Sequence, residues 1–282
     1  MFTFSKIIFQ FIVAGDLDRY TLFGIRQQYS ELFKESCRTR GDHGAFERIF
    51  GQSLSPDPAA VKRFQKPPLP FAFDIPLIPP YNGKPVEIEI GLSLAGTALN
   101  DLPCFIAALQ KYFSKHCEIG CLSGELKGIF AIAGDGGRSP LSADGSKGIV
   151  LLTPDDRLLA ENSLTIGFLT PLSLVREGKS VKHISFADLI KPLMRRISSL
   201  SYYYGGNEPD MDFRWLAAEC SKVEVRYANL RWEQWRGGIA GLVGEVSFIG
   251  RLQDYLPFLL LGEQFHLGKG AAYGMGQYRI IP

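Results

Sequence analysis

Hydrophobic and polar residues change their spacing several times along the first half of the chain. A run rich in Phe, Ile and Val near the beginning is typical of a strand, and Gly15 ends it with a turn signal. The apolar residues that follow recur at three- and four-residue spacing, which predicts a helix. Strict alternation of apolar and polar residues over 86–94 predicts a half-buried strand with Glu87 and Glu89 on its solvent-exposed face. The expected elements are a strand at about 2–13, a helix at about 17–37, a strand at 86–94, a helix from 99 or 102 to 113, and strands at 119–133 and 147–152.

The same order of elements begins again after a polar stretch at 153–162. The expected elements are a strand at 164–169 broken by Thr170-Pro171, a helix at 185–200, strands at 223–235 and 238–249, a short helix at 254–261 and a strand at 278–281. Each half therefore has the order strand, helix, strand, strand, helix, strand of a ferredoxin-like domain. We predict an α+β protein of two tandem ferredoxin-like domains, at 1–158 and 159–282, each an RRM-like antiparallel sheet with helices on one face.

A proline-rich segment separates the first predicted helix from the second strand. Residues 55–85 contain nine prolines. Because proline fixes φ and lacks the amide donor, we expect an extended crossing segment there, without a helix or a central strand.

Composition indicates a folded protein with little bulk charge. The formal net charge is only +2, which excludes a nucleic-acid binder that works by overall charge but leaves room for a local basic surface. The small basic excess lies in the C-terminal half. The N-terminal apolar run has no basic flank and no later run reaches membrane-spanning length, so we expect neither a signal peptide nor a membrane partner.

The cysteines favour reduced thiols in a cytoplasm. They are five in number and none has the C-x2-C spacing of a zinc site or a paired disulfide frame. Cys117 and Cys121 beside His116 lack a second pair of ligands. No metal and no cofactor are therefore expected.

The last twenty residues are punctuated by glycines. Gly268, Gly270, Gly274 and Gly276 surround a basic and aromatic segment that includes Lys269. Glycines this dense let the backbone approach a phosphate and adopt positive φ. A dinucleotide site would need a following helix and a ribose-binding acid, and the six residues after Gly276 supply neither. An enzyme that binds a nucleotide on this loop is therefore disfavoured.

Two segments resemble a known family. Residues 168–174, with the helix that ends at Met194-Arg-Arg-Ile197, are similar to the middle of the CRISPR-associated repeat-processing endoribonucleases, the Cas-six type of the RAMP superfamily. Residues 241–252 and 266–278 resemble that family's C-terminal glycine-rich signature. The likeness covers 164–282 well and the first half only by pattern. RAMP proteins include nucleases as well as RNA-binding subunits that do not cut.

The sequence also departs from this family. Several of its members carry a cysteine cluster after the first helix, where this chain keeps only Cys37. The family typically has an arginine where this chain has Ser173, so one basic contact is missing.

The resemblance implies a metal-independent endoribonuclease that binds and cleaves CRISPR precursor RNA within its repeats. In this reaction the 2'-hydroxyl attacks the adjacent phosphate and leaves a 2',3'-cyclic end, which needs a base, an acid and a cation. The family's histidine in or just after the first helix matches His43, with Tyr29 before it and Arg48 after it. The alternatives are a solvated loop histidine for His43 and a packed core tyrosine for Tyr29.

The RNA contacts are expected in the second half. Lys269 and its flanking glycines suit a phosphate, whereas His266 either contacts RNA or braces the glycine loop. Arg231 and Arg236 flank a segment with two tryptophans, of which alternation places one in the core. Arg195 and Arg196 either line the RNA path or stabilise a helix end. The implied partner is CRISPR repeat RNA, with other CRISPR effector subunits if the protein is a non-catalytic RAMP subunit, and the implied location is a prokaryotic cytoplasm.

Overall fold

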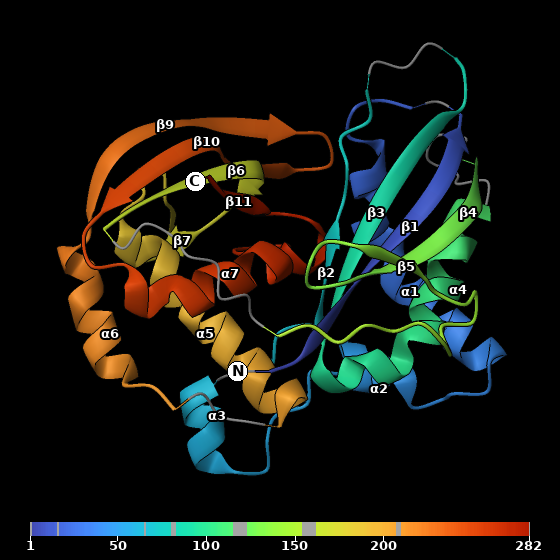
Figure 1. Cartoon of the computed structure of the whole chain (residues 1–282), viewed down its shortest axis with the longest axis horizontal. Coiled ribbons are helices and arrows are strands. Elements are labelled where there is room, and N and C mark those ends of the chain that lie inside the picture. The colour runs from blue at the N-terminus through green and yellow to red at the C-terminus, as the bar shows by residue number, and fades with distance from the viewer. Residues whose placement is uncertain are drawn as a thin grey trace.

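The computed structural model describes residues 2–15, 17–64, 66–79, 83–114, 123–153, 162–206 and 210–281. It contains two antiparallel sheets side by side, each with helices on one face (Figure 1). The predicted α+β fold is confirmed. The predicted boundary between residues 158 and 159 lies outside the described residues.

The N-terminal sheet has the strand order β2-β3-β1-β4-β5, and its four main strands follow the ferredoxin-like order. Odd-numbered residues of β1, such as Ile7, Phe9 and Phe11, are buried against α1 and α4, because successive side chains of a strand point to opposite faces. The strands are β1 (Phe4–Ala14), β2 (Phe71–Asp74), β3 (Val86–Ala95), β4 (Ser123–Ile132) and β5 (Arg138–Pro140). The helices are α1 (Ile25–Thr39), α2 (Ala45–Phe50), α3 (Pro58–Phe64) and α4 (Leu102–Ser114), with 3-10 turns at Thr21–Gly24 and Gly96–Asp101.

The C-terminal sheet repeats this topology with the order β11-β6-β10-β9. A capping box at Ser185 and Asp188 starts its longest helix, α5, whose apolar stripe packs under the sheet. The strands are β6 (Ser163–Leu172), β9 (Glu224–Trp235), β10 (Ile239–Ile249) and β11 (Tyr278–Ile281), with a separate hairpin of β7 (Val175–Arg176) and β8 (Lys179–Ser180). The helices are α5 (Phe186–Gly205), α6 (Phe213–Glu219) and α7 (Leu256–Phe265), with 3-10 turns at Cys220–Lys222, Gln253–Tyr255 and Ala271–Tyr273.

Three local expectations are wrong. The proline-rich segment contains the helix α3, which starts at Pro58, where a missing amide donor costs nothing, and ends before Pro67. No strand forms at 147–152, where Leu152 makes a single bridge to Phe4 and β5 takes the place beside β4. Strand β6 continues through Thr170-Pro171, because the register with β10 shifts there and a bulge tolerates proline.

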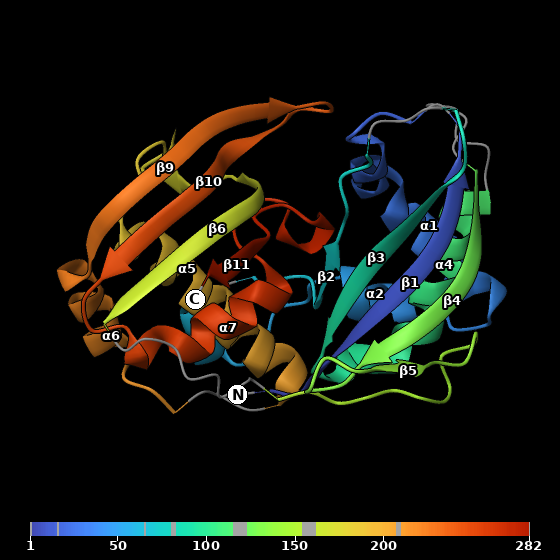
Figure 2. The ribbon, with the colours of Figure 1, turned by 45° about the horizontal axis from the view of Figure 1, so that its top comes forward.

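Several contacts join the two halves. The hairpin of β9 and β10 places Trp235 in the N-terminal core, where the ring stacks on Tyr20 with a centroid separation of 4.8 Å. The glycine-rich loop after α7 packs on β2, and Phe265 lies against Phe2 and Phe4. Figure 2 shows the two sheets flanking this junction, with β2 and β11 nearest to it.

Candidate functional site

His43 lies on the exposed turn between α1 and α2. The turn is held by Asp42, whose Oδ1 accepts from the backbone amides of Gly44 and Ala45 just before and at the start of α2. Arg38 and Arg40, at the end of α1, are exposed. Within the described part of the chain, no carboxylate pairs with either of these two arginines. The turn therefore presents a histidine and two available guanidinium groups to solvent.

Arg48 braces this turn. Its Nη2 lies 2.6 Å from Oδ2 of Asp42 and 2.5 Å from Oδ1 of Asp101, and its Nε donates to both oxygens of Asp101 at 3.2 Å. Hydrogen bonds to Asp101 and then Asp42 raise the pKa of Arg48, while its guanidinium lowers the pKa of Asp42. Since two carboxylates already take up its charge, Arg48 fits a positioning residue better than the cation of a reaction.

Tyr29 is fully buried. Its ring packs among Phe33, Phe71, Phe73 and Phe105, and its hydroxyl donates to the carbonyl oxygen of Phe105 at 3.2 Å. Burial raises the pKa of Tyr29 well above its ordinary value. A substrate cannot reach this hydroxyl in the folded chain, so we correct the expected catalytic set by removing Tyr29.

The glycines of the C-terminal loop permit tight packing of the backbone. Gly268, Gly270, Gly274 and Gly276 have φ of 87°, 81°, 83° and 62°. A Cβ on Gly276 would come within 1.8 Å of the carbonyl oxygen of Leu267. Because of its positive φ and this close approach, position 276 favours glycine over any residue that has a Cβ.

Most of the loop's amides are already used. The amides of Leu267, Lys269, Ala271 and Met275 donate to Gly276, Ser173, Gly268 and Gly270, and those of Tyr273, Gly274 and Gly276 also have backbone acceptors. Within the described residues, the amides of Gly268 and Gly270 have no such acceptor, so the expectation that the loop holds an RNA phosphate stays a prediction. The side chain of Lys269, which is exposed between these two glycines, is a further group that the loop offers to a ligand.

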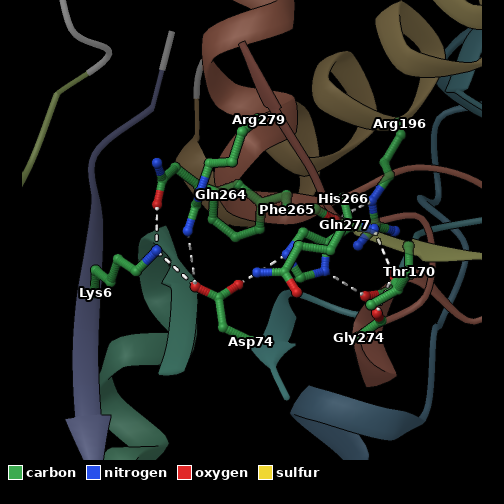
Figure 3. Close-up of polar contacts among 11 residues, drawn as sticks. Lys6, Asp74, Thr170, Arg196, Gln264, Phe265, His266, Gly274, Gln277 and Arg279 are labelled. Carbon is green, nitrogen blue, oxygen red and sulfur yellow. Dashed lines mark hydrogen bonds and ion pairs between the residues drawn. The ribbon is translucent and has the colours of Figure 1, made fainter. Parts of the chain in front are cut away.

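His266 braces the loop against the first half of the chain (Figure 3). It is fully buried, with Nε2 2.9 Å from Oδ1 of Asp74 and Nδ1 3.2 Å from the carbonyl oxygen of Ala271. Both partners are acceptors, so the ring donates to both only in its doubly protonated form. His266 cannot contact RNA from this position. Of the two roles expected for it, the structure supports bracing the loop, and we remove His266 from the expected RNA-binding residues.

Asp74 collects the cationic side chains of Lys6 and Arg279 at this junction, in addition to His266. Lys6 lies 2.7 Å from Oδ2 of Asp74, and Arg279 lies 3.9 Å from the same oxygen. Burial alone would raise the pKa of Asp74, but the hydrogen bond from His266 and the charge of Lys6 outweigh it and hold this pKa well below its usual range. This network ties β1 and β2 to the C-terminal half.

Arg231 and Arg236 are exposed on the hairpin of β9 and β10. Arg231 pairs with Glu233 at 2.6 Å, and Arg236 pairs with Asp18 at 2.5 Å. Arg231 also lines a pocket of about 230 Å³ together with Arg19, which sequence reasoning missed. The two arginine side chains are largely exposed in these pairs, so water and a ligand can compete for them, and both arginines remain predicted RNA contacts.

Other classes of site find no support in the described residues. There, no three His, Cys, Asp or Glu side chains come together to hold a metal ion. Cys37 and Cys104 are buried, and burial raises the pKa of both thiols. None of the helices in these segments is long and apolar enough to cross a membrane.

The arrangement can be compared with known proteins. The family model for the CRISPR-associated endoribonuclease Cas6 matches residues 166–278. One Cas6 product complex has a TM-score of 0.58 at 15% identity, with 99% of this chain and 100% of that chain covered. The chain therefore has the fold of these Cas6 structures, and the resemblance seen in its sequence is confirmed over residues 166–278.

Further solved structures agree with the Cas6-type fold. Thermus thermophilus Cas6 has a TM-score of 0.54 at 14% identity, covering 100% of this chain and 99% of that chain. A partial Cas6-RT-Cas1–Cas2 complex has a TM-score of 0.58 at 10% identity, covering 100% of this chain and 46% of that one. No curated protein matches this sequence. At these identities the solved structures show the fold, and the roles of individual residues rest on the geometry of this chain.

Proposed function

We propose that this chain is a metal-independent endoribonuclease that binds CRISPR precursor RNA and cleaves it within the repeats. The match to the Cas6 family model and the Cas6-type fold support this substrate class. The observation that carries the proposal is the exposed His43 on a turn fixed by the contacts of Arg48 with Asp42 and Asp101.

In the proposed reaction the 2'-oxygen attacks the adjacent phosphorus and the bond to the 5'-oxygen breaks. The products are a 2',3'-cyclic phosphate and a 5'-hydroxyl. The imidazole of His43 takes the proton from the 2'-hydroxyl or gives one to the leaving 5'-oxygen, both of which suit a histidine near neutral pH. Arg38 and Arg40 are the available cations for the phosphorane charge, a role that Arg48 cannot serve while it is paired.

The test is cleavage of the repeat RNA from the adjacent CRISPR array in buffer with EDTA. His43→Ala is expected to lower the single-turnover rate by about 10²–10⁴-fold, the usual contribution of acid–base catalysis. His183→Ala, at an exposed histidine outside this turn, is the matched control and should cleave at the wild-type rate. One structure with this fold is of a Cas6 in which a histidine was replaced by alanine, which makes the histidine the first residue to test.

A second candidate function is a RAMP subunit that binds CRISPR RNA without cutting. The observation that favours it is the loss of two expected catalytic partners, since Tyr29 is buried and Arg48 is paired. Tight RNA binding with no product, and wild-type behaviour of His43→Ala, would establish this role and reject the nuclease. A cyclic phosphate end in the product would reject it.

A further inference from the structure

A second basic site involves residues outside the turn that carries His43. A pocket of about 220 Å³ is bordered by α5, the segment after α3 and the loop, and we call it the α5 pocket. Lys66, Arg195 and Arg196 line it together with Gly268, and none of its lining residues is a carboxylate. Three cations around one small pocket select an anion.

Arg196 has the least compensated of these charges. Its Nε donates to the carbonyl oxygen of Phe265 at 3.0 Å, while its Nη2 is buried and has no hydrogen-bond partner among the described residues. Burial lowers the pKa of Arg196 to about 10. Figure 3 shows the side chain reaching from α5 toward the loop that carries His266. A buried guanidinium nitrogen without a hydrogen-bond partner is costly, and a bound anion removes that cost.

Lys66 and Arg195 complete the charge of the pocket. Both are exposed, and no carboxylate pairs with either within the part of the chain that the structure describes. Their side chains are therefore free to donate to a phosphate, which accepts several charge-assisted hydrogen bonds at once.

A more apolar pocket adjoins the α5 pocket and shares Phe64 and Arg195 with it. It has a volume of about 240 Å³, and Met194 and Phe213 are among its lining residues. An apolar pocket with an aromatic edge suits a nucleobase, and a cationic pocket beside it suits the phosphate of the same nucleotide.

We propose that these two pockets bind one nucleotide of single-stranded RNA, with its phosphodiester in the α5 pocket and its base in the adjoining pocket. The proposal rests on the proposed function in taking RNA as the ligand. The strand is single because the bases of a duplex are stacked inside it and cannot turn into a pocket. None of the residues that line the α5 pocket belongs to the turn that carries His43, so the pocket contributes affinity without taking part in the reaction.

The first test measures binding of 2'-O-methylated repeat RNA by fluorescence anisotropy. This RNA lacks the attacking hydroxyl and stays intact throughout the measurement. Lys66→Ala and Arg195→Ala are each expected to weaken binding about tenfold, as for the loss of one hydrogen bond to a charged group. Each should also lower the slope of log K against log salt by about 0.7, the value for one phosphate contact on a single strand.

Matched controls are available near both residues. Lys62 on α3 and Arg214 on α6 are exposed and line neither pocket. Lys62→Ala and Arg214→Ala should bind as the wild type does. An equal loss of RNA affinity in all four variants would show that only the overall positive charge of the protein matters, and it would overturn the proposal.

The second test locates the nucleotide. Methylphosphonate linkages are introduced one at a time, and one of them should weaken binding to the wild type but not to the Lys66→Ala, Arg195→Ala double variant. An abasic nucleotide next to that linkage should weaken binding further. Sensitivity to a 5'-terminal phosphate alone, with no sensitive internal linkage, would assign the pocket to a terminal phosphate and overturn the phosphodiester proposal.

The outcomes separate this proposal from the nuclease itself. Cleavage that depends on His43, with unchanged affinity in Lys66→Ala and Arg195→Ala, would reject the pocket and leave the nuclease. Affinity that depends on both residues in a protein that makes no product would reject the nuclease and leave the pocket. Wild-type protein that binds no repeat RNA would reject both.

Discussion

Arg48 lies on the element that follows His43, and its contacts assign it a positioning role in place of a catalytic one. Replacing Arg48 by alanine tests this assignment. The substitution removes the bidentate contact with Asp101 and the contact with Asp42. Asp101 is only 2% exposed, so in the variant its carboxylate would remain buried without the hydrogen bonds and the positive charge of Arg48. We expect Arg48→Ala to destabilise the turn and the N-terminal half.

The size of this loss follows from the burial of the two partners. Removing one partner of a fully buried pair costs roughly 3–5 kcal/mol. The side chain of Arg48 is 51% exposed, so water would reach Asp101 in the variant and reduce the cost to about 2 kcal/mol. In a chain of this length about 2 kcal/mol lowers the melting temperature by roughly 5 °C.

The assay is urea unfolding of Arg48→Ala, Arg48→Lys and the Arg48→Ala, Asp101→Asn double variant. Arg48→Lys keeps the charge but loses the fork of two hydrogen bonds, so it should lose about half as much stability. The double variant should regain part of the loss, because it no longer buries an unpaired carboxylate. Single-turnover cleavage measured well below the melting temperature should fall far less than in His43→Ala.

Two results would refute this reasoning. A wild-type unfolding midpoint for Arg48→Ala would show that the contacts with Asp42 and Asp101 do not stabilise the fold. A loss of cleavage as deep as that of His43→Ala, in a variant as stable as the wild type, would return Arg48 to the catalytic set.

Three other substitutions test the loop and the junction. Gly276→Ala should destabilise by roughly 3 kcal/mol because its Cβ would lie 1.8 Å from a backbone oxygen, whereas Gly178→Ala, with φ of 76° and nothing within 4 Å, should cost about 1 kcal/mol; equal melting temperatures would contradict this. Asp74→Asn should destabilise by about 2 kcal/mol near pH 7, and because the pKa of Asp74 is depressed, the difference should shrink as pH falls below about 4; a gap independent of pH in acid unfolding would contradict it. Lys269→Ala should melt like the wild type and weaken RNA binding about fivefold for every sequence tested, and a sequence-dependent loss in a binding titration would argue against a phosphate contact.

The sequence predicted the elements whose hydrophobic period is long and regular. Strand β3 and the helix α5 appear close to their expected limits, and the second half repeats the order of the first. The family resemblance came from glycine spacing in the C-terminal loop, where positive φ leaves few other residues possible. Short elements such as α3 and β5 were missed. They contain too few residues to show a clear hydrophobic period, and the nearby prolines or the loop-like composition indicated an irregular segment.

The candidate site was harder to predict because burial and pairing are not local properties. A tyrosine on an apolar helix face and a histidine in a glycine-rich loop are residue types that also occur in catalytic and binding sites, so the sequence cannot tell a packed residue from a functional one. Only the packed structure shows that Tyr29 lies in an aromatic core and that His266 bonds to Asp74, 192 positions away. The sequence left Arg196 either on the RNA path or at a helix end, and its Nη2 without a hydrogen-bond partner, which favours a bound anion, is visible only in three dimensions.

The sequence by itself therefore determined the repeated α+β architecture, the RAMP resemblance and the place of His43 after the first helix. These follow from periodicity, turn chemistry and the backbone freedom of glycine, which act over a few residues. Tertiary structure alone decided that Tyr29 and His266 are packed, that Arg48 is paired and that Lys66 and Arg195 share a pocket. Those outcomes depend on desolvation and on contacts between distant segments, which no local pattern records.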